Sequence, residues 1–269
     1  MPPKTSPQLT IYRGFIFTGC HVWSPFVNKL ETRLRLAGIP YRTAAGSMRE
    51  APRGKIPYLS IEDDDGNRSM LADTALITRD LVALGVLSDL NAGLSPAERA
   101  QDLAIRALLE DKLSFYLARE RWVDNFYAMR AGALAALPWP VQIVVGQLAY
   151  RNVVKALYGQ GTGRYTADEA RAFKREIWEA LSAVLVAARD GEVAVRARRR
   201  DPRAPFWTLG RAGPTEVDAT VYGFVAASLV CTAAPETGRM VREFEVLVDY
   251  AGRIREGYFG DYDAWDEEV

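Results

Sequence analysis

The stretch GKIPYLSIEDDDGNRSMLADTALITRDL, residues 54–81, decides the fold. Two short apolar runs flank an acidic turn, Glu62 to Asn67, which is typical of a β-hairpin. After Asp73 and Thr74 the apolar spacing changes to that of a helix, and Asp or Thr is a favoured helix N-cap. Pro57 cannot donate a hydrogen bond to a sheet, so it should stand at the start of its strand. A cis bond there would turn the preceding backbone outward.

This order of elements predicts a binding place for a small peptide. Ile56, just before the proline, would present free backbone N–H and C=O groups that can pair with the main chain of a ligand. Asp73 and Thr74, at the start of the following helix, would meet a charged end of the same ligand. Lys55 is the nearest cation, although an exposed lysine is commonly only solvated.

Lys-Ile-Pro-Tyr, a hairpin and Asp-Thr resemble the glutathione-binding half of the glutathione transferases. The resemblance implies glutathione as the cofactor, with its cysteinyl backbone paired to Ile56 and its γ-glutamyl end held by Asp73 and Thr74. Other members usually have Glu-Ser where this chain has Asp73-Thr74. The predicted glutathione-binding residues are Trp23, Lys55, Ile56, Pro57, Asp73 and Thr74.

Composition bounds the class of protein. Among 269 residues, Lys plus Arg and Asp plus Glu are equal at 34 each, which argues against nucleic acid as the main partner. Cys20 and Cys231 make no disulfide framework and no secretory signal opens the chain, so we expect a cytoplasmic protein. With His21 as the single histidine, a multi-histidine metal site is nearly excluded, and we expect no metal.

The first part of the chain is predicted to be thioredoxin-like. Leu9 to Phe17 suits a first strand, and Ile39 to Thr43 a second. Between them, Ser24-Pro25 is a helix start, with Ser as N-cap and Pro in the first turn. Followed by the hairpin and its helix, this gives an α/β domain over residues 1–84.

Residues 85–95 are predicted to be a linker, and residues 96–269 an all-α domain. Ala131 to Ala149 carries no charge, but prolines interrupt it, so we expect a bend between two buried helices and not a membrane span. The Arg-rich segment Gly191 to Pro205 is predicted to be a solvated loop, with a binding patch as the less favoured alternative. A last helix is expected over Glu236 to Glu256.

The second part resembles one branch of the glutathione transferase superfamily, the failed axon connections and metaxin-like proteins. The motifs are spread over nearly the whole chain: residues 23–26, 29–31, 38–41, 109–113, 121–124, 158–164, 214–220 and 253–259. The Arg-rich segment, residues 192–204, is longer than this branch leads us to expect.

Ser24 is the predicted catalytic residue. A hydroxyl donor and helix N–H groups aimed at a thiol favour the thiolate, and Ser24 stands where both could act. The alternatives stay open: Ser24 could be only an N-cap. Cys20 could carry a mixed disulfide with glutathione, or be an inert thiol.

The resemblance implies attack of glutathione thiolate on an apolar, electrophilic small molecule. Two alternatives remain: cis-trans isomerisation of a double bond by addition and elimination, and a non-catalytic adaptor with the same fold. Whether the chain forms a homodimer is left open. The predicted substrate-binding residues are Phe15, His21, Tyr116, Trp122, Phe126 and Tyr127.

Overall fold

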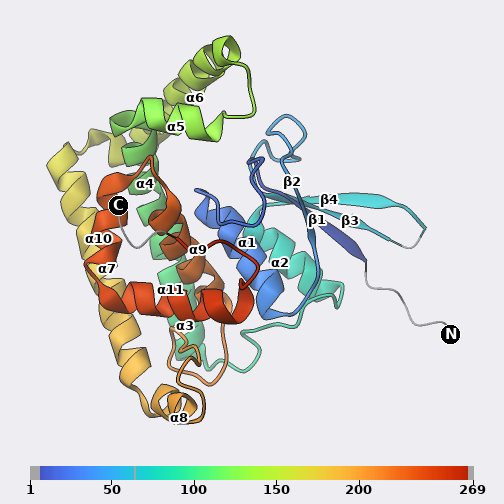
Figure 1. Cartoon of the computed structure of the whole chain (residues 1–269), viewed down its shortest axis with the longest axis vertical. Coiled ribbons are helices and arrows are strands. Elements are labelled where there is room, and N and C mark those ends of the chain that lie inside the picture. The colour runs from blue at the N-terminus through green and yellow to red at the C-terminus, as the bar shows by residue number, and fades with distance from the viewer. Residues whose placement is uncertain (1–6, 64, 266–269) are drawn as a thin grey trace.

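The computed structural model describes residues 7–63 and 65–265. A mixed sheet with two helices forms one part of the molecule, and a larger group of helices forms the other (Figure 1). The predicted fold class is confirmed: an α/β thioredoxin-like part is followed by a helical remainder.

The sheet has four strands in the order β2-β1-β3-β4. They span Gln8–Tyr12 (β1), Arg42–Ala44 (β2), Tyr58–Glu62 (β3) and Arg68–Ala72 (β4). β1 pairs parallel with β2 and antiparallel with β3, and β3 and β4 form the predicted hairpin. Two helices, α1 (Pro25–Leu36) and α2 (Thr74–Ala83), belong to this part.

The first two strands are shorter than the sequence predicts. β1 ends at Tyr12 and not at Phe17, because Gly14 takes a positive φ of 74° that turns the chain out of the sheet. β2 begins at Arg42 and not at Ile39. The apolar side chain of Ile39 instead packs against the core between the sheet and α1, whose buried members include Leu30 and Leu34.

The helical part follows residues 84–95, which connect α2 to α3. Its helices are α3 (Pro96–Ala107), η1 (Leu108–Leu113), α4 (Ser114–Arg119), η2 (Glu120–Asp124), α5 (Phe126–Ala133), α6 (Trp139–Gln160), η3 (Thr162–Arg164), α7 (Ala167–Asp190), α8 (Glu192–Arg200), α9 (Glu216–Val230), α10 (Pro235–Arg242) and α11 (Glu245–Tyr258). η1 and η2 are π-helical, and η3 is a single 3₁₀ turn.

Two predictions about this part are wrong. The Arg-rich segment is not a loop, because most of it forms α8: Glu192 lies in the first turn and three arginines in the last, which suits the helix dipole. The predicted last helix is two helices, α10 and α11. The break falls at Phe244, whose non-helical backbone lets its ring pack against the core.

The uncharged stretch bends as predicted but is not buried. α5 and α6 are separate helices, with Pro138 preceding α6. Within α6, only Gly146 and Leu157 are buried. No single helix in the described residues is long and apolar enough to cross a membrane; α9 and α10 pass by length and composition as a pair bent by 118°.

α9 joins the two parts of the molecule. It is buried from Val217 to Leu229 and packs along α1. Gly223 allows the close approach, because a Cβ there would lie 2.6 Å from the carbonyl oxygen of Pro25 and 2.7 Å from the amide nitrogen of Lys29. The relative position of the two parts therefore depends on a residue without a side chain.

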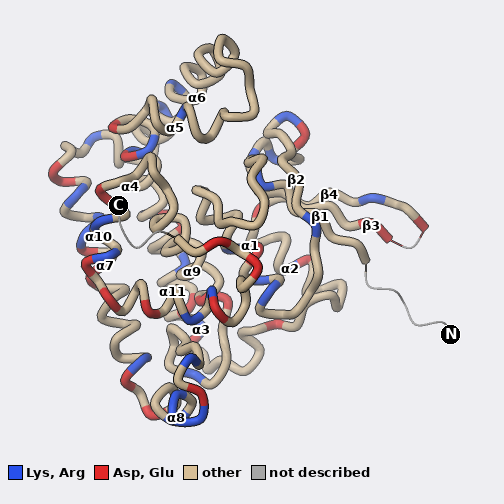
Figure 2. The backbone as a smooth tube through the Cα atoms, in the orientation of Figure 1, with Lys and Arg blue, Asp and Glu red and all other residues tan. Residues whose placement is uncertain are grey.

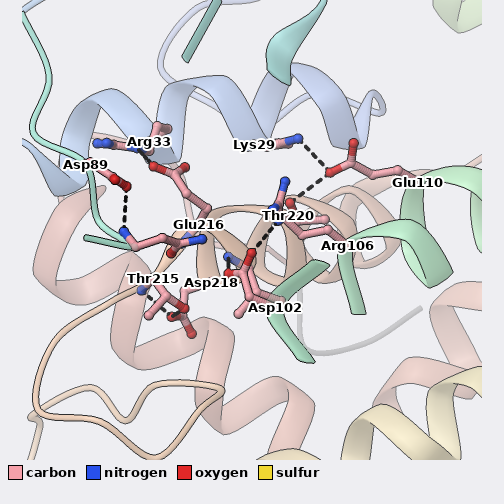
Figure 3. A network of polar contacts seen from close by, with 12 residues as sticks. Lys29, Arg33, Asp89, Asp102, Arg106, Glu110, Thr215, Glu216, Asp218 and Thr220 are labelled. Carbon is pink, nitrogen blue, oxygen red and sulfur yellow. Dashed lines mark hydrogen bonds and ion pairs between the residues drawn. The ribbon is translucent and has the colours of Figure 1, made fainter. Parts of the chain in front are cut away.

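Polar contacts fix the same junction (Figure 3). Arg33 Nε on α1 donates to Glu216 Oε1 at 2.7 Å, and Lys29 Nζ donates to Glu110 Oε1 at 2.6 Å. Glu110 Oε1 also accepts from Thr220 of α9 at 2.9 Å. These partners come from α1, η1 and α9, so the network connects three elements that are far apart in the sequence.

Candidate functional site

The loop that leads into α1 is held from inside the molecule. The Asn28 side chain makes two hydrogen bonds with the backbone of Val22, at 2.9 and 3.2 Å. Arg13 donates to the carbonyl oxygens of Phe17 and Cys20, at 2.9 and 2.5 Å. The backbone that carries Ser24 is therefore fixed by buried groups on both sides of it.

Ser24 is the N-cap of α1, as the sequence predicts. Its Oγ accepts from the Val27 amide at 3.4 Å, which is long for such a bond. The hydroxyl proton is not used by this contact, so Ser24 can still donate. Ser24 is half-buried, at the positive end of the dipole of a 12-residue helix.

The Ile56–Pro57 peptide bond is cis, and Pro57 directly precedes β3. The backbone N–H and C=O of Ile56 make no hydrogen bond within the part of the chain that the structure describes. A ligand main chain can therefore pair with both groups, as the sequence analysis expects.

Asp73 and Thr74 lie at the start of α2. Asp73 is the N-cap: Oδ1 accepts from the Ala75 and Leu76 amides at 3.1 and 3.2 Å. It has the one positive φ of a non-glycine residue in the described ranges, 76°. Asp73 is exposed and its Oδ2 makes no hydrogen bond to the residues that the structure describes, while Thr74 is buried beneath it. One carboxylate oxygen is thus used for the helix, and the other is available to a ligand.

A cleft of about 590 Å³ lies between the two parts of the molecule and brings these residues together. From the α/β part it is lined by Phe26, Arg53, Lys55, Ile56, Pro57, Asp73 and Thr74, and from the helical part by Glu110, Asp111, Ser114 and Phe115. Five of the six predicted glutathione-binding residues therefore face one cleft; Trp23 does not. Ser24 does not line it either, although Phe26, two residues further along α1, does.

Both cationic and anionic side chains line this cleft. Arg53 and Lys55 are exposed cations that precede the cis proline. Asp73 and Asp111 supply anions from α2 and η1. A zwitterionic ligand with carboxylates and an ammonium group would find opposite charges at separate places along the cleft.

The carboxylate of Glu110 is less available to a ligand than that of Asp111. Its Oε1 is used by Lys29 and Thr220, as Figure 3 shows. Lys29 is buried, so this ion pair also compensates a cation that would otherwise be costly to bury. Glu110 thus joins the cleft to the α1–α9 junction behind it.

Six residues that line the cleft are not among the site residues predicted from the sequence: Phe26, Arg53, Glu110, Asp111, Ser114 and Phe115. A usable signal exists on the helical side. Glu110 and Ser114, like Asp111 and Phe115, are four residues apart, so they share one helix face. On this face Phe115 lines the cleft, whereas the predicted residue Tyr116 does not.

His21 lies away from the cleft. It is buried, its Nε2 lies 2.8 Å from Tyr222 Oη, and its ring also contacts Phe259, Tyr262 and Trp265. Burial lowers the pKa of His21 to about 3, and the neighbouring Arg13 adds to this. A neutral, enclosed imidazole cannot contact a ligand in the cleft, so its role is to anchor the loop before Ser24.

The Cys20 thiol is half-buried and unactivated. Desolvation raises its pKa, which the nearby cation Arg13 only partly offsets. A thiol with a raised pKa is protonated at neutral pH and is a poor nucleophile. This weighs against the alternative in which Cys20 carries glutathione.

Trp23 and Phe15 form a ring pair next to the helix start. Their centroids lie 6.3 Å apart in an edge-on arrangement. Trp23 also packs against Met129 and beside Gly132 of α5, where a Cβ would come within 2.0 Å of the indole. Trp23 therefore bridges the two parts of the molecule instead of lining the cleft.

The four aromatic residues predicted on the helical side do not line the cleft either. Tyr116 is buried in the helical core and stacks on Phe173 of α7. Trp122 packs in the same cluster as Trp23. Phe126 contacts Tyr150 of α6, and Tyr127 is 75% exposed. The reason is the direction in which side chains point around the helix axis: when Ser114 and Phe115 face the cleft, Tyr116 points into the helical core.

Part of the chain is similar in sequence to known proteins. Residues 25–127 match the family model described as glutathione S-transferase N-terminal domain. Failed axon connections of Drosophila melanogaster is 26% identical over 175 residues, covering 60% of this chain and 40% of that protein. The chain is thus similar to the N-terminal domain of glutathione transferases over residues 25–127, which are less than half of its length. It spans less than half the length of this curated relative, so the relative's full organisation does not carry over.

Solved structures agree with this fold. The β-etherase LigF from Sphingobium is 13% identical with a TM-score of 0.57, covering 92% of this chain and 95% of that one. Ure2p in complex with glutathione is also 13% identical, with a TM-score of 0.56 and coverages of 94% and 90%. Maleylacetoacetate isomerase from Anaeromyxobacter dehalogenans, with a bound glutathione derivative, is 15% identical, with a TM-score of 0.51 and coverage of 98% on both sides.

Proposed function

We propose that this glutathione transferase-like chain binds glutathione in the cleft between its two parts and adds the glutathione thiolate to an electrophilic small molecule. One observation carries the proposal: the unpaired backbone groups of Ile56 and the free oxygen of Asp73 face the same cleft. The cysteinyl main chain pairs with Ile56. The γ-glutamyl end, with its ammonium group, lies at Asp73, Thr74 and Asp111.

The remaining charges of glutathione have partners as well. Its glycyl carboxylate lies toward Lys55 and Arg53, the two exposed cations of the cleft. With the two ends of the tripeptide held in this way, we expect its thiol to lie near Phe26, the residue of α1 that lines the cleft two positions after Ser24. Because all of these groups come from one chain, the proposed glutathione site needs no second subunit.

Ser24 is proposed to stabilise the thiolate. Its Oγ–H donates to the sulfur, and the α1 N-terminus adds a favourable field. The sulfur then attacks an electrophilic carbon. A C–S bond forms and the leaving group departs with its electron pair, or, with a conjugated double bond, the resulting carbanion takes up a proton.

Transfer is favoured over isomerisation by what lines the cleft. Isomerisation requires that the adduct stay bound until it collapses, which an enclosed aromatic lid would favour. The residues predicted to form such a lid, Tyr116 and Trp122 among them, pack elsewhere. Phe26 and Phe115 supply the aromatic surface of the cleft. This suits a small apolar electrophile whose product can leave.

Turnover by Ser24→Ala tests the proposal. A charge-assisted hydrogen bond of about 1.5–3 kcal/mol corresponds to a loss of turnover of about 10- to 150-fold. Ser24→Thr keeps both the hydroxyl and the cap, and should retain most activity. Cys20→Ser should leave the turnover nearly unchanged.

The ultraviolet absorbance of the thiolate separates catalysis from capping. The pKa of bound glutathione should rise in Ser24→Ala and stay unchanged in Ser24→Thr. A full loss of activity in Cys20→Ser with Ser24→Ala intact would favour the redox alternative. Recovery of all glutathione after product formation would favour the isomerase.

A further inference from the structure

The α5–α6 hairpin, residues 126–160, projects from the body of the helical part (Figure 1). It contacts the rest of the molecule through α4, η2 and η3, and through Met129 and Gly132 of α5, which pack against Trp23. Its outer residues are large and apolar: Trp139 is 67% exposed, Val144 61% and Leu148 54%. Exposed apolar side chains of this size, gathered on one projecting element, indicate an interaction surface.

Five of the exposed residues of α6 form a stripe along the helix. Val141, Val144, Leu148, Arg151 and Lys155 recur at intervals of three or four residues, so they share a face. All five are exposed. The stripe is apolar over its first half and basic over its second, and its polarity therefore changes along the helix axis.

The charge of this region has a single sign. No Asp or Glu lies between Asp124 and Asp168, whereas Arg130, Arg151, Lys155 and Arg164 do. Figure 2 shows the projecting hairpin in tan and blue. A surface that combines exposed apolar side chains with cations alone is complementary to a partner that is apolar inside and anionic outside.

We propose that this stripe docks the protein on an anionic lipid bilayer. The apolar half, formed by Val141, Val144 and Leu148, would enter the boundary between headgroups and acyl chains, and Arg151 and Lys155 would lie among the anionic headgroups. The helix rests in the plane of the interface and does not cross the bilayer, which agrees with the absence of a spanning single helix in the described residues.

A second copy of the chain fits this surface less well. Two such faces brought together would leave their cations without acidic partners, because residues 125–167 contain no Asp or Glu. An acidic protein would need a groove shaped to a projecting helix, whereas a bilayer adapts to it. The proposal does not depend on glutathione binding, since none of the cleft residues lies on α5 or α6.

Vesicle flotation of the full chain tests the proposal, with phosphatidylcholine alone and mixed with phosphatidylserine. We expect binding to the anionic vesicles, weaker binding to the neutral ones, and a decrease as salt is raised. Arg151→Gln with Lys155→Gln should weaken binding about fivefold per charge. Leu148→Glu should reduce it further, because a carboxylate then faces the lipid.

Matched controls make the result specific. Leu103→Glu alters a residue of α3 that is 59% exposed, and Arg199→Gln with Arg200→Gln removes two exposed cations of α8. Both should bind vesicles like the parent chain, and all variants should keep the parent circular dichroism spectrum.

Three results would overturn the proposal. One is absence of binding to anionic vesicles. Another is loss of binding in the α8 variant with the α6 variants unaffected, which would move the surface to the Arg-rich helix. The third is a dimer that Leu148→Glu converts to monomer, which would make the stripe an interface between copies of this chain.

Discussion

α9 and α6 are both long helices with few charges, yet α9 is buried in the molecule and α6 is largely exposed. α9 is buried from Val217 to Leu229, whereas α6 buries only Gly146 and Leu157. The difference lies in what surrounds each helix. α9 has α1 packed closely across Gly223, with the Arg33–Glu216 and Lys29–Glu110 ion pairs at the same junction. α6 has no comparable covering element among the described residues.

This comparison shows that apolar composition alone does not determine burial. A helix enters the core when a neighbour can approach it closely and when the polar groups nearby are paired. The following predictions compare matched substitutions on the two helices, or examine the contacts that α9 makes.

The largest effect is expected for a methyl group added at the α1–α9 contact. Gly223→Ala would place a Cβ against backbone atoms that cannot move independently, and should lower the free energy of unfolding by about 3 kcal/mol. Gly159→Ala, in α6, meets no atom within 4 Å. Because Ala favours a helix over Gly, that variant should be neutral or more stable by about 0.5–1 kcal/mol. Denaturant titration measures both, and equal effects would contradict the comparison.

A matched pair of leucines gives the next effect. Leu229 of α9 is 4% exposed and Leu148 of α6 is 54% exposed. Leu229→Ala should cost about 2–3 kcal/mol, as for a buried leucine, while Leu148→Ala should stay within about 0.5 kcal/mol. A large cost at Leu148 would show that α6 is covered in solution, and would weaken the proposed docking surface as well.

A pH-dependent effect is expected at the contact between His21 and Tyr222 of α9. The native pKa of His21 is lowered from 6.5 to about 3, so below pH 6.5 the unfolded chain binds a proton that the native chain does not. Native stability from this group is therefore complete above pH 6.5 and is lost as the pH falls toward 3, by about 1.4 kcal/mol per pH unit.

Glu31, a buried residue of α1 that pairs with Arg13, changes the stability with pH in the opposite direction. Burial raises its pKa from 4.5 to about 7, so its contribution is complete below pH 4.5 and is lost as the pH rises through 7. The parent chain should thus change little between pH 4.5 and 6.5. The stability difference between parent and His21→Gln isolates the histidine and should shrink as the pH falls. Tyr222→Phe, which keeps His21, should shift stability by an amount independent of pH; a constant difference for His21→Gln would show that His21 titrates normally.

Much of the fold and half of the site could be predicted from the sequence. The 54–81 stretch contains its own local signals: a turn between apolar runs, a proline before a strand, and Asp73 as an N-cap. These depend on neighbours in the sequence, and the structure has the hairpin, the cis bond and α2 as expected.

The helical side of the cleft could not be predicted because it depends on rotation about helix axes. Tyr116 and Phe115 are adjacent, but the first enters the core and the second lines the cleft. Likewise, His21 is three residues from Ser24 and yet is enclosed by aromatic rings from the C-terminal region. Neither outcome follows from residue type, since both depend on contacts between segments that are distant in the sequence.

The central claim is that Asp73 and Ile56 form a glutathione site, and calorimetric titration with glutathione tests it most directly. We expect saturable binding at one site per chain. Asp73→Asn keeps the helix cap and tolerates the positive φ, but removes the charge, so it should weaken binding by about 1.5–3 kcal/mol with the fold intact. A parent chain that binds no glutathione, or a folded Asp73→Asn variant with unchanged affinity, would contradict the claim.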